Sequence, residues 1–211
     1  MQQGREQAAP RYPDILGIIL AGGLSSRMGQ NKALLTLENG ITFLERTWQL
    51  LGLCVDSRLL VTRSNTFSAR YSCLEDACER HGPVGGIFTA LRFARDADFS
   101  AVLALACDMP FLNLELLRRL LAAHARRKQQ TLLTAYTSHG RIEGLCAVYA
   151  REALPYFEAA LAHGEYSLYA VIPQDRMQCL AVSESEDRAL YNVNTPDDLA
   201  LVRKKLGSDQ G

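Results

Sequence analysis

The sequence lacks the features that mark membrane proteins and nucleic-acid-binding proteins. None of its apolar runs approaches the length of a membrane-spanning helix. Residues 1–13 are polar and contain no apolar core of the kind found in signal peptides. Basic and acidic residues balance at 23 each, so no overall positive charge attracts a polyanion. We therefore expect a cytoplasmic protein with no membrane or nucleic-acid partner.

A recognisable zinc motif is also missing. The six cysteines form no C-x-x-C pair, and the four histidines are scattered along the chain. Most of the cysteines lie in apolar sequence surroundings, which favours buried free thiols over metal ligands. They are Cys54, Cys73, Cys78, Cys107, Cys146 and Cys179.

Two common phosphate-binding motifs are absent from the glycine-rich segment near the N-terminus. Gly22 and Gly23 are adjacent, so they do not form the dinucleotide pattern G-x-G-x-x-G. They are not followed by the Gly-Lys-Ser/Thr ending of a P-loop either. No Ser-His-Asp or Cys-His arrangement is evident, which is consistent with catalysis that needs no side-chain nucleophile.

What this segment does contain predicts a phosphate-binding loop. Residues 15–32 read ILGIILAGGLSSRMGQNK, an uncharged apolar half followed by glycines, Arg27 and Lys32. The apolar half is long enough for one buried strand. Glycine lets the backbone approach a ligand and point its amides at anionic oxygens, and the two cations would add charge. The alternative is a tight turn with both cations merely solvated.

A second strong pattern is found at residues 100–110, SAVLALACDMP. Residues 101–106 are wholly apolar, as expected of a central parallel strand that is buried on both faces. Asp108 follows this strand, and a carboxylate at such a position suits Mg²⁺, which prefers oxygen ligands. Asp108 could instead cap the helix expected from residue 114, although Asn113 is better placed for that role.

Other polar residues follow shorter predicted strands. Asn65 lies just after the strand predicted at 57–62, at an edge where ligands bind in open parallel sheets, although asparagine is also common in turns. A short strand predicted from residue 73 ends in two acids, of which Asp76 is the candidate site residue and Glu75 the alternative. Asn192 and Asn194 lie on an extended segment, where both could face a cleft.

Two glycines stand early in the helix expected after His81. Gly85 and Gly86 each cost roughly 1 kcal/mol relative to alanine in a helix. Close approach by a ligand, or by another part of the backbone, would explain them. A close contact between helix and sheet is the simpler alternative.

Strands and helices alternate along the chain, and the strands are apolar and uncharged. This pattern predicts an α/β fold with three layers, α/β/α, around a mostly parallel sheet. The length suits one domain, which we expect over residues 14–206 with flexible tails at 1–13 and 207–211.

The segment LAGGLSSRMGQNK at residues 20–32 resembles the L-A-G-G-x-S-x-R-M-G-x-x-K motif of the molybdenum cofactor guanylyltransferase family. The resemblance covers nearly the whole chain, with further matches at residues 82–87, 107–110 and 192–196. It implies a Rossmann-like nucleotidyltransferase fold and a reaction that requires Mg²⁺. In that reaction GMP passes from GTP to the phosphate of molybdenum-molybdopterin, giving molybdopterin guanine dinucleotide and pyrophosphate.

The resemblance also implies roles for individual residues. Arg27 and Lys32 would stabilise the phosphates, and Asp108 would bind Mg²⁺. Asn192 and Asn194 would lie beside the active site on the acceptor side. The implied nucleotide-binding residues are Leu20, Ala21, Gly22, Gly23, Lys32, Asn65, Asp76 and Asp108.

The chain departs from the family pattern on the acceptor side. Glu143 and Gly144 stand where His-Pro is usual, and residues 163–168 replace an arginine-rich segment. A cytidylyltransferase, or another NTP transferase of this fold with a different phosphorylated acceptor, is therefore an alternative. A nucleotide-binding protein without catalysis is another. The resemblance further implies transient contact with molybdoenzymes or cofactor-delivery proteins.

Overall fold

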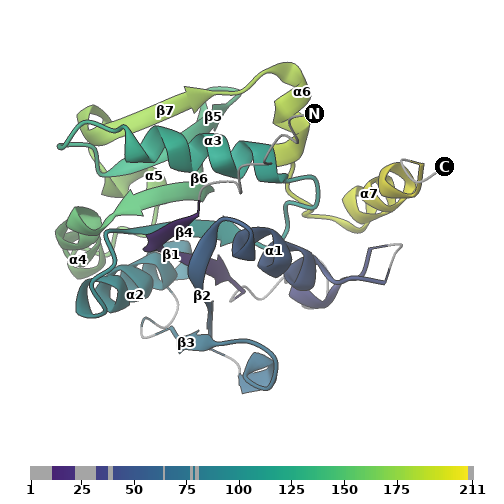
Figure 1. Ribbon diagram of the computed structural model, residues 1–211, viewed down its shortest axis with the longest axis horizontal. Helices are drawn as coiled ribbons and strands as arrows, with labels where there is room; N and C mark the ends of the chain where they lie inside the picture. The colour runs from purple at the N-terminus through teal and green to yellow at the C-terminus, as the bar shows by residue number, and fades with distance from the viewer. Residues whose placement is uncertain are drawn as a thin grey trace, which may run out of the picture.

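The computed structural model contains a seven-stranded sheet with helices on both faces (Figure 1). The strand order is β3-β2-β1-β4-β6-β5-β7. The structure describes residues 11–21, 32–37, 40–63, 65–76, 78 and 81–208. The strands are β1 (Tyr12–Leu20), β2 (Val55–Thr62), β3 (Cys73–Glu75), β4 (Ala101–Ala106), β5 (Leu133–Ser138), β6 (Arg141–Ala150) and β7 (Met177–Ala181).

Helices of very different lengths connect these strands. The α-helices are α1 (Phe43–Gly52), α2 (Gly82–Asp96), α3 (Leu114–Ala125), α4 (Leu154–Ala162), α5 (Leu168–Val171), α6 (Glu184–Asp187) and α7 (Pro196–Ser208). Short 3₁₀ helices are η1 (Lys32–Leu34), η2 (Asn65–Phe67), η3 (Arg151–Ala153), η4 (Gln174–Arg176) and η5 (Arg188–Leu190). Within the described residues, no helix is long and apolar enough to cross a bilayer.

The predicted three-layer α/β fold with a mostly parallel sheet is confirmed. β1 pairs in parallel with β2 and β4, β2 with β3, and β5 with β7. β6 is the exception, because it runs antiparallel to both β4 and β5. A two-residue turn forces this direction: His139 and Gly140 both have positive φ, as a tight hairpin between β5 and β6 requires.

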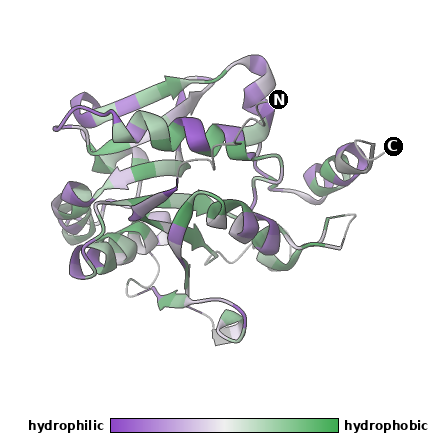
Figure 2. Cartoon of the chain, viewed as in Figure 1, coloured by the Kyte–Doolittle hydropathy of each residue, from purple (hydrophilic) through white to green (hydrophobic). Residues whose placement is uncertain are grey.

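Two apolar layers hold the helices against the sheet. Leu44 of α1 and Leu117 of α3 belong to one buried cluster, and Ile87 of α2 and Phe157 of α4 belong to the other. β4 lies between them, with all of its residues buried and those from Ala101 to Leu105 alternating from one cluster to the other. Figure 2 shows the contrast between a buried and a surface element: the strand β4 has the hydrophobic colour, and the helix α6 has the hydrophilic colour.

Local sequence signals account for several helix ends. Thr42 and Glu45 form a capping box at the start of α1. Asn113 caps α3, its side-chain oxygen accepting a hydrogen bond from the Leu116 amide at 3.0 Å. Asn113 therefore fills the cap position that was the alternative role for Asp108.

Three expectations need correction. β1 begins at Tyr12, inside the predicted tail, because the Tyr12 amide donates to the Cys54 carbonyl at 3.0 Å. α7 continues through residue 208, past the predicted end of the domain. Only three of the six cysteines are buried, since three lie at the margins of the apolar clusters or outside them. Cys54, Cys107 and Cys146 are buried, Cys73 and Cys78 are partly buried, and Cys179 is exposed.

A third, smaller apolar cluster joins distant parts of the chain. Val193 and Val202 pack with Leu35, Leu37 and Phe43. This cluster ties α7, which stands to one side in Figure 1, to the segment that follows η1. It brings the region around Lys32 next to the region around Asn194.

Candidate active site

Most of the predicted site residues that the structure describes lie at one edge of the sheet. Leu20 at the end of β1 pairs with Ala106 at the end of β4, and Asp108 follows two residues later. Asp76 directly follows β3, and Asn65 lies in η2 after β2. We call this the C-terminal edge. Because β2 and β1 separate β3 from β4, the edge from Asp76 to Asp108 spans about 14 Å.

A lysine joins two oxygen-bearing side chains at this edge. The Lys32 ammonium lies 3.0 Å from the Asp108 carboxylate (Oδ2) and 2.9 Å from the Asn194 amide oxygen. The Lys32 and Asp108 side chains are 18% and 19% exposed, so they remain within reach of a ligand. We call these three residues the Lys32 cluster. It places a cation and a carboxylate at the end of a wholly buried strand.

The backbone on both sides of Asn194 is fixed by hydrogen bonds. The Val193 amide donates to the Asp108 carbonyl at 2.9 Å. The Asp198 carboxylate accepts hydrogen bonds from the amides of Asn194 and Thr195 at 2.9 and 2.8 Å, and from the Tyr191 hydroxyl. These hydrogen bonds lower the pKa of Asp198 to about 2, and the bond from the Tyr191 hydroxyl makes the largest contribution. The start of α7 therefore holds Asn194 in place.

The two predicted asparagines have different surroundings. Asn194 contacts Lys32, whereas the Asn192 side chain donates to the Leu190 carbonyl at 3.2 Å. Among the described residues, Asn192 makes no hydrogen bond to Lys32 or Asp108. The structure thus brings Asn194 alone of this pair into the Lys32 cluster.

At the far end of the edge, Asp76 is held more firmly than Glu75. Its carboxylate accepts hydrogen bonds from the Cys78 amide at 3.1 Å and the Thr89 hydroxyl at 3.3 Å. Glu75 is exposed. Gly85 lies against the same loop, since a Cβ there would come within 2.8 Å of the Cys78 Cβ.

Gly86 has a different explanation. A Cβ on Gly86 would meet the Leu20 Cδ2 atom at 2.7 Å, so close packing of α2 on the sheet accounts for this glycine. Leu20 is one of the predicted nucleotide contacts. Its neighbour Ala21 donates its amide hydrogen to the Val61 carbonyl at 3.1 Å, which extends the sheet pairing past β1.

Part of the prediction cannot be placed. Gly22, Gly23 and Arg27 lie outside the described residues. Asn65 has a described backbone in η2, but its side chain is outside the description. The phosphate contacts expected of these residues therefore stay predictions.

Sequence reasoning did not select Glu143 as a site residue. It lies on β6 and is partly buried, and burial raises its pKa, with smaller contributions from Asp187 and Asp108. The signal that could have found it is pairing geometry, because β6 runs antiparallel beside β4. That direction could not be predicted from a strand pattern alone.

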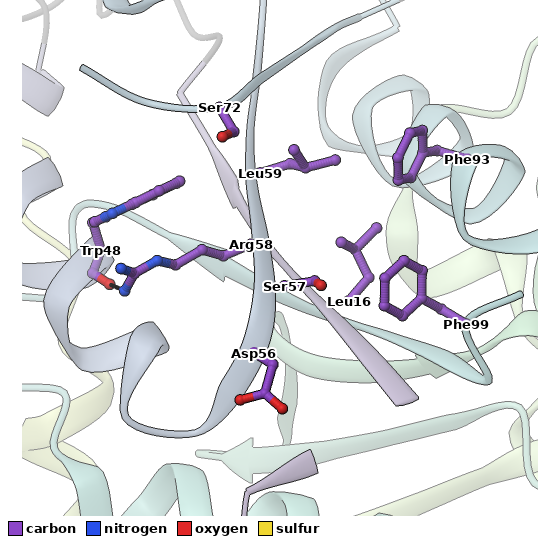
Figure 3. Close-up of a pocket in the computed structure, with 9 residues that line it drawn as sticks. All are labelled: Leu16, Trp48, Asp56, Ser57, Arg58, Leu59, Ser72, Phe93 and Phe99. Atoms are coloured by element: carbon purple, nitrogen blue, oxygen red, sulfur yellow. Dashed lines mark hydrogen bonds between the residues drawn. The ribbon is translucent and has the colours of Figure 1, made fainter. Parts of the chain in front are cut away.

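A surface cavity of about 470 Å³ lies elsewhere, along the first half of β2 (Figure 3). In the figure, Trp48 and Arg58 lie on one side of β2, and Phe93 and Phe99 on the other. The Arg58 guanidinium donates to the Trp48 carbonyl at 2.7 Å and stacks on its ring. None of the predicted site residues lines this cavity.

The donors at the C-terminal edge fit a hard cation. An Asp108 carboxylate oxygen and the Asn194 amide oxygen already converge on one positive charge. Oxygen donors of this kind are what Mg²⁺ prefers. Within the described chain, no group of three or more His, Cys, Asp or Glu side chains is arranged to hold a metal. A cation here would therefore rely on few protein ligands and on substrate phosphates, as Mg²⁺ commonly does.

The fold thus sets a lysine-paired carboxylate after β4, and in sequence a glycine-rich segment follows the neighbouring strand β1. Residues 17–178 match the family model of the MobA-like NTP transferase domain. The chain therefore belongs to the MobA-like NTP transferase family.

Two relatives illustrate the similarity in sequence. A protein of Flavobacterium johnsoniae named probable molybdenum cofactor guanylyltransferase is 30% identical over 182 residues, covering 86% of this chain and 92% of its own length. A protein of Nostoc sp. with the same name is 32% identical over 196 residues, covering 90% and 91%.

Solved structures show the same fold. Molybdopterin-guanine dinucleotide biosynthesis protein A from Archaeoglobus fulgidus superposes with a TM-score of 0.77 at 24% identity, covering 92% of this chain and 99% of its own. A 4-diphosphocytidyl-2C-methyl-D-erythritol synthase from Anaerococcus prevotii reaches 0.63 at 14% identity, covering 92% and 96%. At these identities the likeness concerns the fold alone.

Proposed function

We propose that this protein transfers GMP from GTP to the terminal phosphate of molybdenum-molybdopterin, releasing pyrophosphate. The observation that carries the proposal is the Lys32 cluster at the end of β4. The names of the relatives in Flavobacterium and Nostoc support the choice of guanine and of this acceptor.

The proposed chemistry needs positioning and charge more than a base. An oxygen of the acceptor phosphate forms a bond to the α-phosphorus of GTP, and the bond from that phosphorus to the bridging oxygen of pyrophosphate breaks. The attacking phosphate is already ionised at neutral pH, so no side chain has to remove a proton. Holding the reactants in line and neutralising charge supply the rate enhancement.

The Lys32 cluster suits the charged end of this reaction. The Lys32 ammonium would neutralise the charge that develops on the leaving pyrophosphate, a role that a mobile point charge can fill. Asp108 would hold Mg²⁺, with the Asn194 amide oxygen close by. Bound there, Mg²⁺ would supply Lewis-acid stabilisation of the reacting phosphates.

The opposite end of the C-terminal edge would receive the nucleoside. Asp76, fixed by Cys78 and Thr89, and Asn65 in η2 lie toward β3 and β2, on the far side of β1 from Asp108. The glycine-rich segment after β1 lies in sequence between Leu20 and Lys32, so it would follow the phosphates between these two ends. GTP would therefore lie along the edge with its nucleoside toward Asp76 and its phosphates toward the Lys32 cluster.

Calorimetric titration with GTP, CTP, ATP and UTP, with and without Mg²⁺, tests the nucleotide part of the proposal. We expect selective GTP binding that Mg²⁺ strengthens. Preference for CTP would overturn the choice of guanine and move the activity to a cytidylyltransferase. Pyrophosphate release with GTP and the acceptor would then separate an enzyme from a protein that only binds nucleotide.

A further inference from the structure

An irregular stretch of β6 begins where its pairing with β4 ends, at the C-terminal edge. Between the pairs Ala135↔Ala147 and Thr137↔Ile142, two steps along β5 correspond to five along β6. The residues in excess form a bulge over positions 143–146. Bulges are common beside active sites, where they redirect a side chain.

Glu143 lies at the same edge of the sheet as the carboxylate of the Lys32 cluster. Leu105 of β4 pairs with Cys146 of β6 in an antiparallel register. Glu143 precedes Cys146 by three residues and Asp108 follows Leu105 by three, so both lie beyond this pair on the C-terminal side of β4. Burial raises the pKa of Glu143, and the charges of Asp187 and Asp108 add to that rise.

Within the described part of the chain, Glu143 differs from the nearby acids Asp108 and Asp187 in having no partner. Asp108 is paired with Lys32, and Asp187 accepts hydrogen bonds from Ser138 and His139. Among the residues that the structure describes, Glu143 makes no hydrogen bond and no ion pair. A partly buried carboxylate in that condition is costly until a donor reaches it.

The position of Glu143 in the sheet points to one of the two substrates. In the order β3-β2-β1-β4-β6, the segments proposed to hold GTP follow β1, β2 and β3, and Asp108 follows β4. Glu143, on β6, lies on the other side of Asp108. A ligand there would approach the reacting phosphate from the acceptor side.

We propose that Glu143 is a specificity-determining residue that receives the ring of the acceptor, accepting hydrogen bonds from an amino group and the adjacent ring N–H. This inference rests on the proposed function and names the recognition element for its second substrate. A pterin ring carries such a pair of N–H donors side by side. A carboxylate matches the pair with two parallel hydrogen bonds, as it does a guanidinium.

Guanine carries the same pair of donors, so the experiment must separate the two rings. The probes are 6-hydroxymethylpterin phosphate, its 2-dimethylamino analogue, which lacks the amino N–H donors, and GTP with Mg²⁺. Binding is followed by quenching of pterin fluorescence and, for GTP, by calorimetry. The variant is Glu143→Gln, and Glu158→Gln on the exposed face of α4 is the matched control.

We expect Glu143→Gln to weaken binding of the pterin phosphate by about 10- to 100-fold, because a charged pair of hydrogen bonds is replaced by one bond and one clash between donors. The dimethylamino analogue should bind the wild-type protein weakly and be insensitive to the substitution. Binding of GTP, its dependence on Mg²⁺ and the thermal midpoint should be unchanged. Glu158→Gln should match the wild-type protein throughout.

Four results would overturn the inference. Unchanged pterin binding in Glu143→Gln, or no binding by the wild-type protein, would show that Glu143 does not recognise this ring. Weaker GTP binding would assign Glu143 to guanine, and a higher Mg²⁺ requirement would make it a metal ligand. The proposed function fails separately, if the wild-type protein binds the pterin phosphate through Glu143 but transfers no GMP.

Discussion

The two halves of the sheet differ in strand direction and in how their acidic side chains are paired. The parallel half, β1 to β4, ends in a row of loops at one edge, and its acid Asp108 is paired with Lys32. The mixed half, β5 to β7, reaches the same edge through an antiparallel strand and a bulge, and its acid Glu143 is unpaired among the described residues. The difference teaches that the parallel half carries a paired cation and carboxylate, whereas the mixed half carries a carboxylate with no partner among the described residues.

The largest effect should come from the acid and the lysine of the parallel half. Asp108→Asn or Lys32→Ala should lower the rate of GMP transfer by about 100- to 1,000-fold, since each removes charge stabilisation at the reacting phosphates. Thermal unfolding should change little, because the two side chains are partly exposed and lie at the sheet edge. Near-normal turnover of either variant with GTP and Mg²⁺ would remove the parallel half from the chemistry.

A buried histidine in the mixed half should make stability depend on pH. His124 of α3 is buried against Thr134 of β5, with 3.0 Å between Nδ1 and Oγ1. Burial, reinforced by the charge of Arg127, lowers the pKa of His124 to about 3. The folded protein therefore keeps this ring neutral, while the unfolded chain binds a proton below its ordinary pKa of about 6.5.

The sign follows from that difference in proton binding. The contribution of the neutral His124 to the free energy of unfolding is fully present above pH 6.5 and is lost as the pH falls from there toward 3. Between pH 7 and pH 5 the loss attributable to His124 should be about 2 kcal/mol. Urea unfolding of the wild-type protein and of His124→Gln at both pH values measures it. Equal losses in both proteins would show that other groups carry the pH dependence.

Sequence patterns predicted the parallel half better than the mixed half. A wholly apolar strand and the acid after it are local signals, and they predict the strand at residues 101–106 and a site acid at Asp108. The contact of Lys32 with Asn194 spans 162 residues of sequence and depends on how α7 packs. Likewise the bulge in β6 depends on tertiary pairing, so the one sequence signal at Glu143 is the departure from the family pattern at residues 143 and 144.

Glycines offer a smaller test of the same contrast. In the parallel half, a Cβ on Gly85 would lie 2.8 Å from the Cys78 Cβ and 3.2 Å from its carbonyl oxygen, which are backbone-fixed atoms. Gly85→Ala should cost about 1 to 2 kcal/mol, with overpacking partly offset by helix propensity. It should also weaken nucleotide binding, because Cys78 holds Asp76.

The matched change in the mixed half is Gly144→Ala. Its nearest neighbours are the Leu168 Cδ1 at 3.1 Å and the Tyr149 hydroxyl at 3.2 Å, which are ends of side chains and can yield. We expect a stability loss below about 1 kcal/mol. Urea unfolding measures the stability of both variants, and titration with GTP measures their nucleotide affinity. A larger loss of either quantity in Gly144→Ala than in Gly85→Ala would contradict this account.

Effects of similarly small size should come from the two capping boxes. Thr42→Ala at α1 should cost about 1 kcal/mol, since α1 packs its apolar face on the sheet. Ser183→Ala at the short α6 should cost about 0.5 kcal/mol, because bonds from Arg119 to Glu186 and to the Ala181 carbonyl also hold that segment. Thermal unfolding that ranked the two in the opposite order would argue against a rigid parallel half.

The most direct test of the central claim is transfer of label from GTP carrying ³²P at the α-phosphate. The protein would be incubated with labelled GTP, Mg²⁺ and molybdenum-molybdopterin, with Asp108→Asn as the control. We predict that label appears in the guanine dinucleotide, that pyrophosphate is released in equal amount, and that the variant fails on both counts. Binding of GTP without transfer of label, or efficient transfer from CTP instead, would contradict the account.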